Sequence, residues 1–399
     1  MKLRLHTAAC FFAFLASFVC RGQELVTDSL EQMHQDSLAV TESDDFVTAS
    51  ILTATPSDVL YSCVGHASIR MQCPHHNLDV VYTYESEPVA NRVLSFFMGG
   101  LKMGMTSVPT ERMLADYGKE GRGITEYVLN IPLEKRKQLW QYLDSKVAEG
   151  MNLPYDYLNR SCALGCLRAV RAAVLPDTLS FGEWDERLVR KSRRALLGDR
   201  TEDFPWDRFI IFSITGTEAD MACNVMDKVV LPSDLTEVLQ KATLNSQPVL
   251  GEVNTLLQQT AGIDEGGWLT PMSLACVLLL LAIVSCFWMQ RPLSLLLLAL
   301  QSVFGLMMTY LIVFSALPNT SFSWLIIPYN LLPLLLWKWR KWWLLPFCVV
   351  CVVWCVAMLT RIENPLVDNA HIVLVTAFAV NYMGQWNIIR NSNQNKITK

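Results

Sequence analysis

The sequence is poor in charged residues. Only 18% of its 399 residues are Asp, Glu, Lys or Arg, against about 25% in an average soluble chain. The deficit is uneven, because the first two thirds have an ordinary globular composition, whereas charge nearly disappears over long runs after Trp268. The net charge of −4 also provides no basic excess of the kind that nucleic-acid binding requires. The composition therefore predicts one soluble domain and a membrane block, with no nucleic acid as a partner.

The N-terminus has the pattern of a secretory signal peptide over residues 1–22. Lys2 and Arg4 form the charged region, and the apolar run Thr7–Val19 is too short to cross a bilayer comfortably. An uncleaved anchor is the alternative. Residues 23–45 are polar and acidic without periodicity, so we expect a flexible lead-in to the exported part of the chain.

The C-terminal third predicts an all-α transmembrane bundle of about five helices within residues 268–386. The expected spans are residues 268–289, 292–316, 322–337, 342–360 and 366–386. The third span is short and contains Pro328 and Pro333, so a broken or tilted helix is expected there. Basic residues around Arg340 and in the tail 387–399 fall on one side of this map. The positive-inside rule therefore makes that side cytoplasmic and places the preceding domain outside the cytoplasm.

Residues 46–242 are expected to form the exported domain, and residues 243–267 a polar connector to the first span. An alternating run at His66–Met71 and a β-rich run at Asp79–Tyr84 flank a turn at Pro74–Asn77, which predicts a hairpin. A further strand and three helices are expected at Ile124–Asn130, Pro132–Ala148, Cys162–Val174 and Pro232–Ala242. Strands and helices that mix in this way predict an α+β domain.

Cys162 and His66 are the residues with the clearest potential for catalysis. Cys162 opens an expected helix with Ser161 as its N-cap, where the helix dipole and free N–H groups favour a thiolate and can hold an oxyanion. His66 begins a strand, from which an imidazole can take a thiol proton and later return it. Taken alone the pair is a weak signal, because free cysteines and strand histidines are more often structural.

Other thiols and imidazoles leave alternatives open. One set near the hairpin has the chemistry of zinc ligands: Cys63, His66, Cys73, His75 and His76. Its spacing matches no common zinc site, so neither a metal nor another cofactor is expected. Cys63 and Cys73 can instead form a disulfide or remain reduced. Cys166, one helical turn after Cys162, is a core residue or a resolving thiol. His371, near the outer end of the last span, is an interfacial histidine or a substrate contact.

Four segments together resemble a known family. They are Tyr61–Arg70, Asp79–Tyr84, Gly121–Asn130 and Tyr155–Cys162. In this order they are similar to the periplasmic domain of the Bacteroides-type lipoprotein N-acyltransferase, Lnb, which looks like a circularly permuted NlpC/P60-type papain-like fold. The resemblance covers residues 46–242, and Asn319 and the run Tyr329–Pro333 look like the family's membrane segment. One difference is Ser161, where the family usually has Asn.

The resemblance implies an inner-membrane enzyme with a periplasmic catalytic domain. Such an enzyme moves an acyl chain from a phospholipid, through a thioester on Cys162, to the α-amine of a diacylated lipoprotein, with His66 as base and acid. A third residue that orients the histidine is implied on the following strand. Tyr82 occupies about that position and Asp79 begins the strand, although a core aromatic and a strand-edge residue are the ordinary roles of such residues.

Two other functions stay open at this stage. A membrane-anchored cysteine peptidase or amidase would use the same cysteine and histidine, but several spans are a large anchor for a soluble substrate. A membrane scaffold without catalytic activity would need neither residue. Both alternatives leave the expected fold and topology unchanged, so only the chemistry of the site distinguishes the three.

Overall fold

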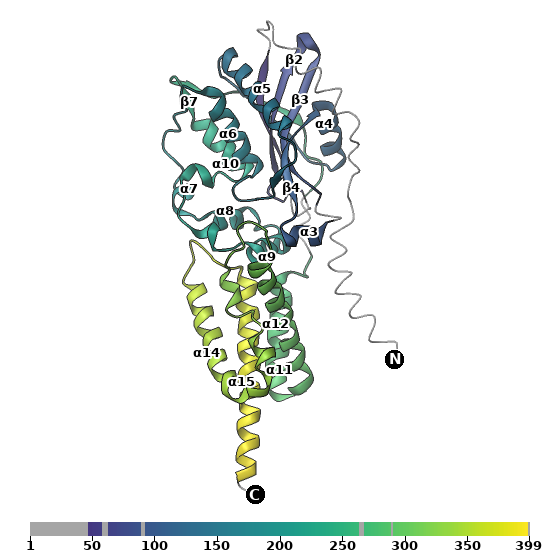
Figure 1. Cartoon of the computed structure of the whole chain (residues 1–399), viewed down its shortest axis with the longest axis vertical. Coiled ribbons are helices and arrows are strands. Elements are labelled where there is room, and N and C mark those ends of the chain that lie inside the picture. The colour runs from purple at the N-terminus through teal and green to yellow at the C-terminus, as the bar shows by residue number, and fades with distance from the viewer. Residues whose placement is uncertain (1–46, 58–62, 89–91, 263–266, 289, 398–399) are drawn as a thin grey trace. The chain divides into compact units, whose positions relative to one another are not determined.

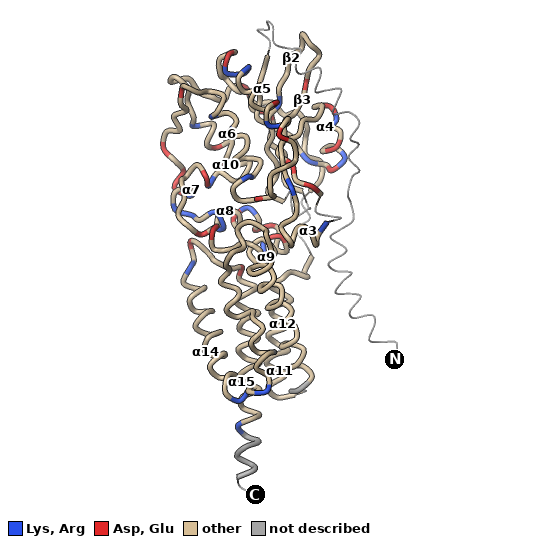
Figure 2. Tube along the Cα trace, in the orientation of Figure 1, with Lys and Arg blue, Asp and Glu red and all other residues tan. Residues whose placement is uncertain are grey.

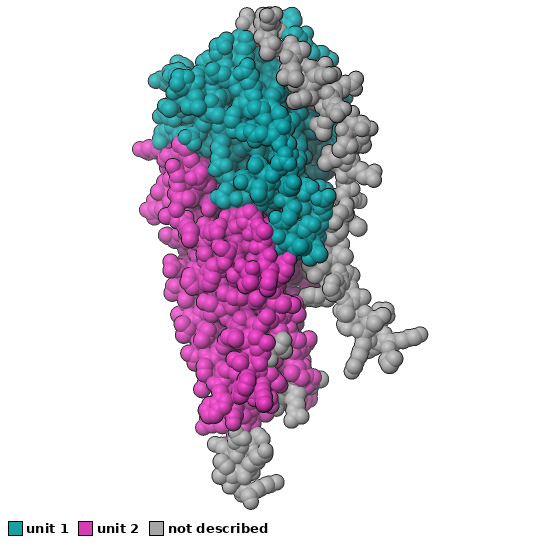
Figure 3. Space-filling view, in the orientation of Figure 1, with its two compact units in different colours: residues 1–54, 66–182, 232–260 teal, residues 55–65, 183–231, 261–399 magenta. Residues whose placement is uncertain are grey.

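The computed structural model of the protein describes residues 47–57, 63–88, 92–262, 267–288 and 290–397. The expected signal peptide and lead-in lie outside the described residues. The chain groups into two compact units, which Figure 3 colours separately. Unit 1 takes residues up to 54 together with 66–182 and 232–260, and unit 2 takes 55–65, 183–231 and 261–399.

This division differs from the linear one expected from the sequence. Residues 183–231, expected within the exported domain, group with the C-terminal block in unit 2. Backbone hydrogen bonds join the two parts of unit 2, because Gly216 N–H donates to Asn319 O at 2.6 Å and Thr217 N–H donates to Phe322 O at 2.8 Å. The expected connector also begins with strands, so part of it belongs to unit 1.

Unit 1 is built on a seven-stranded sheet in the order β6-β4-β3-β2-β1-β5-β9 (Figure 1). Every neighbouring pair of strands is antiparallel. The strands are β1 (Thr48–Ala54), β2 (His66–Cys73), β3 (Leu78–Ser86), β4 (Lys102–Pro109), β5 (Ile124–Leu129), β6 (Leu153–Pro154) and β9 (Leu250–Leu257), beside a small hairpin of β7 (Thr243–Leu244) and β8 (Gln247–Pro248). The expected hairpin is confirmed as β2 and β3, joined by the short 3-10 turn η4 (Pro74–His76) and by Asn77 in the left-handed conformation at φ 50°.

Helices cover both faces of this sheet. The helices of unit 1 are α3 (Val93–Met98), α4 (Thr110–Lys119), α5 (Leu133–Ala148), α6 (Cys162–Val174) and α10 (Pro232–Lys241). Figure 1 shows α5, α6 and α10 on one side and α4 on the other. Strand alternation explains the two faces, because the Tyr82 side chain reaches α5 whereas Val81 packs with Met113 of α4. The expected helices at 132–148, 162–174 and 232–242 are therefore confirmed.

A close approach between α6 and β3 places the start of α6 against the sheet. A side chain at Gly165 would lie 2.2 Å from two ring carbons of Tyr84, so only glycine allows this contact. The next residue, Cys166, is buried, as are most residues of the helix. Packing along this face therefore holds Cys162, three residues before Gly165, at a defined position relative to β2 and β3.

Unit 2 contains the helical membrane block together with three short helices that precede it. Its α-helices are α7 (Glu186–Arg190), α8 (Arg193–Arg200), α9 (Pro205–Ile214), α11 (Pro271–Phe287), α12 (Gln290–Val313), α13 (Leu332–Leu335), α14 (Arg340–Leu359) and α15 (Asn369–Ile397). Three segments are long and apolar enough to cross a membrane: Pro292–Val313, Trp337–Leu359 and Asn369–Arg390. The helix α11 is also apolar but shorter. Figure 2 shows that these helices are almost free of charge along their length.

The third expected span, residues 322–337, is not a continuous helix. It consists of the 3-10 turn η7 (Trp324–Ile326), the single turn α13, and η8 (Trp337–Trp339). Pro328 and Pro333 explain the break, because proline removes a backbone donor and clashes within a helix. Side chains of other helices bind backbone oxygens of this segment, with Gln301 Nε2 donating to Pro328 O at 2.7 Å and Trp354 Nε1 to Trp324 O at 2.9 Å. Irregular backbone in a membrane block requires such internal partners.

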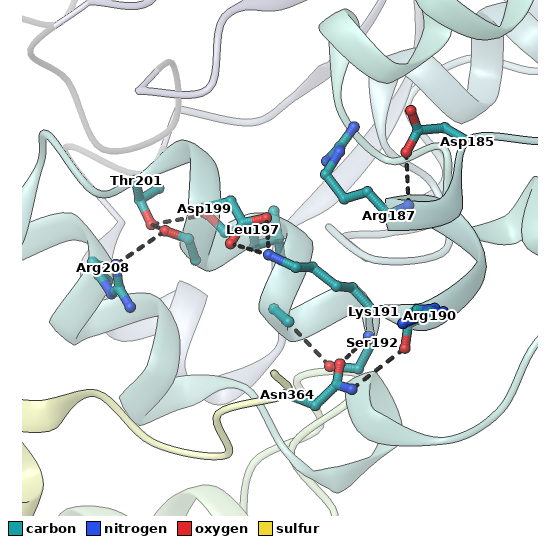
Figure 4. A network of polar contacts seen from close by, with 12 residues as sticks. Asp185, Arg187, Arg190, Lys191, Ser192, Leu197, Asp199, Thr201, Arg208 and Asn364 are labelled. Atoms are coloured by element: carbon teal, nitrogen blue, oxygen red, sulfur yellow. Dashed lines mark hydrogen bonds and ion pairs between the residues drawn. The ribbon is translucent and has the colours of Figure 1, made fainter. Parts of the chain in front are cut away.

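Polar contacts connect the short helices α7 and α8 with the loop between α14 and α15. Figure 4 shows Asn364 of this loop between Arg190 and Ser192. Its Oδ1 accepts from Ser192 N–H at 2.6 Å, and its Nδ2 donates to Arg190 O at 3.3 Å. Lys191 pairs with Asp199 at 2.7 Å within the same network. The segment 183–231 is thus bound to the membrane block through its backbone and its side chains.

His371 is fully buried inside unit 2. Its Nε2 lies 3.0 Å from Ser213 Oγ, its Nδ1 lies 3.1 Å from Tyr329 OH, and its ring stacks on Phe209 at 4.2 Å. Both ring nitrogens therefore have hydrogen-bond partners. These contacts tie α9 and the broken segment to α15, which is the role of a structural histidine.

Candidate active site

Cys162 is the first residue of α6, as expected. Ser161 caps the helix, because its Oγ accepts the backbone N–H of Leu164 at 3.2 Å. The loop before the cap is held by Asp156, whose Oδ1 accepts the backbone N–H groups of Leu158 and Asn159 at 3.2 and 3.0 Å. Cys162 is half-buried as a residue.

The Cys162 sulfur lies against the beginning of β2. The backbone N–H groups of Ala67, the residue after His66, and of Ala163 lie close enough to this sulfur to lower the pKa of the thiol. The N-terminus of α6 and the histidine strand therefore meet at the thiol. Backbone donors that surround a sulfur stabilise negative charge on it and on an oxygen nearby.

The His66 side chain lies on the same face of the sheet as Thr83 of the neighbouring strand β3. The His66 Nε2 atom lies 2.5 Å from Thr83 Oγ1. Burial, together with the positive charge of Arg122, lowers the pKa of His66 to about 4. The imidazole is therefore neutral near pH 7, which is the form that can accept a proton.

Burial raises the pKa of the Cys162 thiol, and this effect outweighs the N–H groups and Arg122, which lower it. The sequence suggested that the helix terminus favours a thiolate. The structure retains those donors, but desolvation of the sulfur leaves the resting group a thiol. A reaction at Cys162 thus needs a base to remove the proton, and the adjoining strand begins with the neutral imidazole of His66.

Arg122 is a functional candidate that the sequence did not single out. It lies in the Gly121-Arg-Gly123 turn before β5, its side chain is only 4% exposed, and its guanidinium lies 4.4 Å from the centre of the Tyr117 ring. Its positive charge lowers the pKa of both His66 and Cys162. One guanidinium close to both residues can stabilise a thiolate or an oxyanion. The available signal was an arginine between two glycines, which has no specific chemical meaning by itself.

We expect Arg122→Gln to slow alkylation of Cys162 by iodoacetamide. Loss of the positive charge raises the pKa of the thiol further, and each unit of pKa costs about tenfold in the thiolate fraction at a fixed pH below that pKa. The measurement is the alkylation rate of Cys162 between pH 7 and 9.5, followed by mass spectrometry. Lys119→Gln on the exposed side of α4 is the matched control. An alkylation profile equal to that of the wild type would remove Arg122 from the site.

Tyr82 and Asp79, the residues suggested for orienting the histidine, are engaged elsewhere. The Tyr82 hydroxyl donates to Asp144 at 2.5 Å and accepts from Trp140 at 2.9 Å, on the face covered by α5. Asp79 pairs with Arg70 at 2.5 Å. Asp79 is opposite Gln72, and β2 extends about 20 Å from Gln72 back to the histidine. Thr83 contacts the imidazole instead. It pairs across the sheet with Ser68, which lies two residues after His66 in β2 and therefore on the same face.

The other thiols and imidazoles near the hairpin and in α6 are buried in the core or exposed at the surface. All ten cysteines in the described part of the chain are free thiols, Cys63 and Cys73 among them. Cys166 is buried, and burial raises its pKa well above the usual value, as expected for a core residue. His75 and His76 are exposed in η4. Within the described residues, no three His, Cys, Asp or Glu side chains are grouped closely enough to hold a metal ion.

Comparison with known proteins gives one match. Residues 38–188 match the family model of the Lnb N-terminal periplasmic domain. The matched range includes His66, Thr83, Arg122 and Cys162 and ends before the membrane block. No curated protein and no solved structure matches the chain.

Proposed function

Since residues 38–188 match the family model of the Lnb N-terminal periplasmic domain, we propose that the protein is a lipoprotein N-acyltransferase. In this proposal it transfers an acyl chain from a membrane phospholipid to the α-amine of a diacylglyceryl-cysteine at the N-terminus of a lipoprotein. The observation that supports it most directly is the position of the Cys162 sulfur, at a helix N-terminus and against the strand that starts with His66. Covalent catalysis by a thiol uses such an arrangement. The proposal includes a permuted papain-like fold for unit 1.

The first step acylates Cys162. His66 removes the thiol proton as the sulfur attacks an ester carbonyl of the phospholipid, and a tetrahedral oxyanion forms. When Nε2 donates its hydrogen to Thr83, Nδ1 holds the lone pair that accepts the proton. Collapse of the intermediate breaks the ester bond, and the imidazolium returns the proton to the departing alkoxide. A lysophospholipid leaves, and a thioester remains on Cys162.

The second step transfers the acyl group to the lipoprotein. The α-amine of the diacylglyceryl-cysteine attacks the thioester carbonyl, and His66 takes a proton from the attacking nitrogen. The carbon–sulfur bond then breaks, the proton returns to the sulfur, and the product is an amide on a triacylated lipoprotein. The thiol and the imidazole are regenerated, so the cycle needs no cofactor.

Backbone donors and Arg122 support both tetrahedral intermediates in this scheme. The N–H groups of Ala67 and Ala163 lie near the sulfur, so an oxyanion on the attacked carbon lies within the same positive environment. Removal of one such donor from an enzyme typically costs 10²- to 10³-fold in rate. The buried Arg122 guanidinium, which pairs with Glu120 at 3.4 Å, adds positive charge in a low-dielectric site, where its effect is larger than in water.

The three membrane-capable helices and the periplasmic domain family fit a membrane protein with a periplasmic domain. We further propose that the membrane is the inner one and that residue 319 is periplasmic and residue 399 cytoplasmic. This location suits the substrates, because both carry lipid anchors. Alkaline phosphatase and green fluorescent protein fusions after Asn319 and Lys399 test the orientation. Fluorescence from the fusion at Asn319 would show that the topology is inverted.

The function is tested by the intact mass of lipoprotein N-termini in cells with and without this protein. In a bacterial host depleted of its own N-acyltransferase, we expect lipoproteins to gain the mass of one acyl chain when the protein is produced. Lipoproteins that remain diacylated, with the protein correctly inserted, would reject the proposal. Cleavage of peptidoglycan or a peptide by the purified protein would favour the amidase alternative.

A further inference from the structure

A short helix of unit 1 presents large apolar side chains to the surface. The helix α3 spans Val93–Met98, contains no charged residue, and ends at Gly99 in the left-handed conformation at φ 74°. Leu94 is 71% exposed and Met98 is 50% exposed. Exposed apolar side chains that cluster on one short element often mark a surface that contacts an apolar partner.

The other side of α3 packs onto the chain that leads to the nucleophile. The Phe96 ring lies edge-on to Tyr155, with 5.7 Å between ring centres, and 5.4 Å from Phe97. The backbone N–H of Tyr155 donates to Leu101 O at 3.0 Å, which holds the two segments together. Tyr155 is also close enough to Cys162 for the charge of a thiolate to contribute to its raised pKa. Apolar and aromatic side chains therefore lead from the exposed tip of α3 toward the active-site thiol.

We propose that α3, with Phe96 and Tyr155, is the site at which a fatty acyl chain leaves the bilayer and is guided toward Cys162. The proposal rests on the acyltransferase function and adds the place where the lipid chain binds. In this arrangement Leu94 and Met98 contact the hydrocarbon of the membrane. The rings of Phe96 and Tyr155 line the path of the chain that is to be transferred.

The hydrocarbon chain is favoured over a protein partner by the composition of the helix and by its place in the chain. A site for an acyl chain needs apolar side chains without charge, which α3 provides. The last strand of unit 1 ends at Leu257, and the first apolar helix follows in the sequence at Pro271, so a short segment ties the domain to the part of the chain that we propose to lie in the bilayer.

The test compares two acyl donors in the full-length protein reconstituted in vesicles of phosphatidylethanolamine and phosphatidylglycerol. The variant carries Leu94→Gln and Met98→Gln. We expect the rate at which Cys162 is acylated by vesicle phospholipid to fall about tenfold or more, as for the loss of apolar contacts to a substrate chain. Acetylation by the soluble donor p-nitrophenyl acetate should stay within about twofold, since the thiol and base are intact. Leu175→Gln with Val253→Gln, two exposed apolar residues elsewhere in unit 1, is the control.

An unchanged phospholipid rate, or an equal loss with both donors, would overturn the proposal. A second measurement does not depend on turnover. A phospholipid with a diazirine in its acyl chain should label the peptide that contains residues 93–98 in Cys162→Ala as strongly as in the wild type, and the double variant should lose this labelling. Absence of labelling rejects the lipid site. Labelling of a wild-type protein whose Cys162 is never acylated by phospholipid rejects the acyltransferase function instead, so the two failures are distinguishable.

Discussion

Cys162→Ala is expected to abolish acyl transfer while the protein is still produced and inserted in the membrane. The sulfur is the atom to which the acyl group is attached in the proposed cycle, and loss of a catalytic nucleophile typically costs about 10⁴-fold or more. Cys162→Ser should be nearly as damaging, because a serine hydroxyl is far harder to deprotonate than a thiol at this site. Cys162 is the first residue of α6, and neither replacement is larger than cysteine, so the protein should still fold.

The covalent intermediate can be measured directly. Wild-type protein given phospholipid but no acceptor amine should accumulate one acyl group on Cys162, visible as a mass increase, and hydroxylamine should release it as expected for a thioester. Cys223→Ala, which removes a partly exposed thiol outside the site, is the matched control and should acylate normally. An acyl group on another residue, or full activity in Cys162→Ala, would disprove this mechanism.

His66→Ala is the second substitution with a large expected effect. Burial raises the pKa of the Cys162 thiol, so the thiol cannot supply much thiolate without a base. We expect a loss of about 10²- to 10⁴-fold in the rate of acylation, the usual contribution of a general base. The exposed His75 in the turn after β2 provides the control, and His75→Ala should leave the rate unchanged.

The pH dependence of acylation gives His66 a distinct signature. Its pKa is lowered to about 4 by burial and by Arg122, so the imidazole loses its function as a base only when the pH falls through that value. The rate should therefore stay nearly constant from neutral pH down to about pH 5 and then decline toward pH 4. A stopped-flow acylation series from pH 3.5 to 8 measures this. An inflection near pH 6.5 would show that a solvated histidine, and not a buried one, is the base.

Signals that operate within a few residues predicted their elements well. The helix at Cys162–Val174 was predicted with its correct ends, because the Ser161 cap, the apolar periodicity and the following proline all act within one or two helical turns. The β2–β3 hairpin followed from alternating residues on both sides of a turn. The membrane block followed from the lack of charge, which a bilayer demands of any span.

Elements that depend on partners far away in the chain were harder to predict from the sequence. The strand β9 was expected to be part of a polar connector, because it lies at the edge of the sheet and leaves most of its residues exposed or half-buried. Its pairing with β5 comes from a segment more than 100 residues earlier in the chain. The irregular backbone of the third expected span likewise relies on distant residues, because Gln301 and Trp354 of other helices donate hydrogen bonds to its backbone oxygens.

The sequence by itself identified the thiol and the imidazole, because the start of a helix and the start of a strand are local features with known chemistry. It did not identify the groups around them. Tyr82, and not Thr83, was expected to orient the histidine. Strand alternation places the Thr83 side chain on the same face of the sheet as His66 and the Tyr82 side chain on the opposite face. Arg122 acquires its role only through folding, since burial beside Tyr117 and proximity to two other elements create its electrostatic effect. The local sequence therefore determines which residues can react, whereas tertiary packing decides their protonation states and their partners, because desolvation and charge act between segments far apart in the chain.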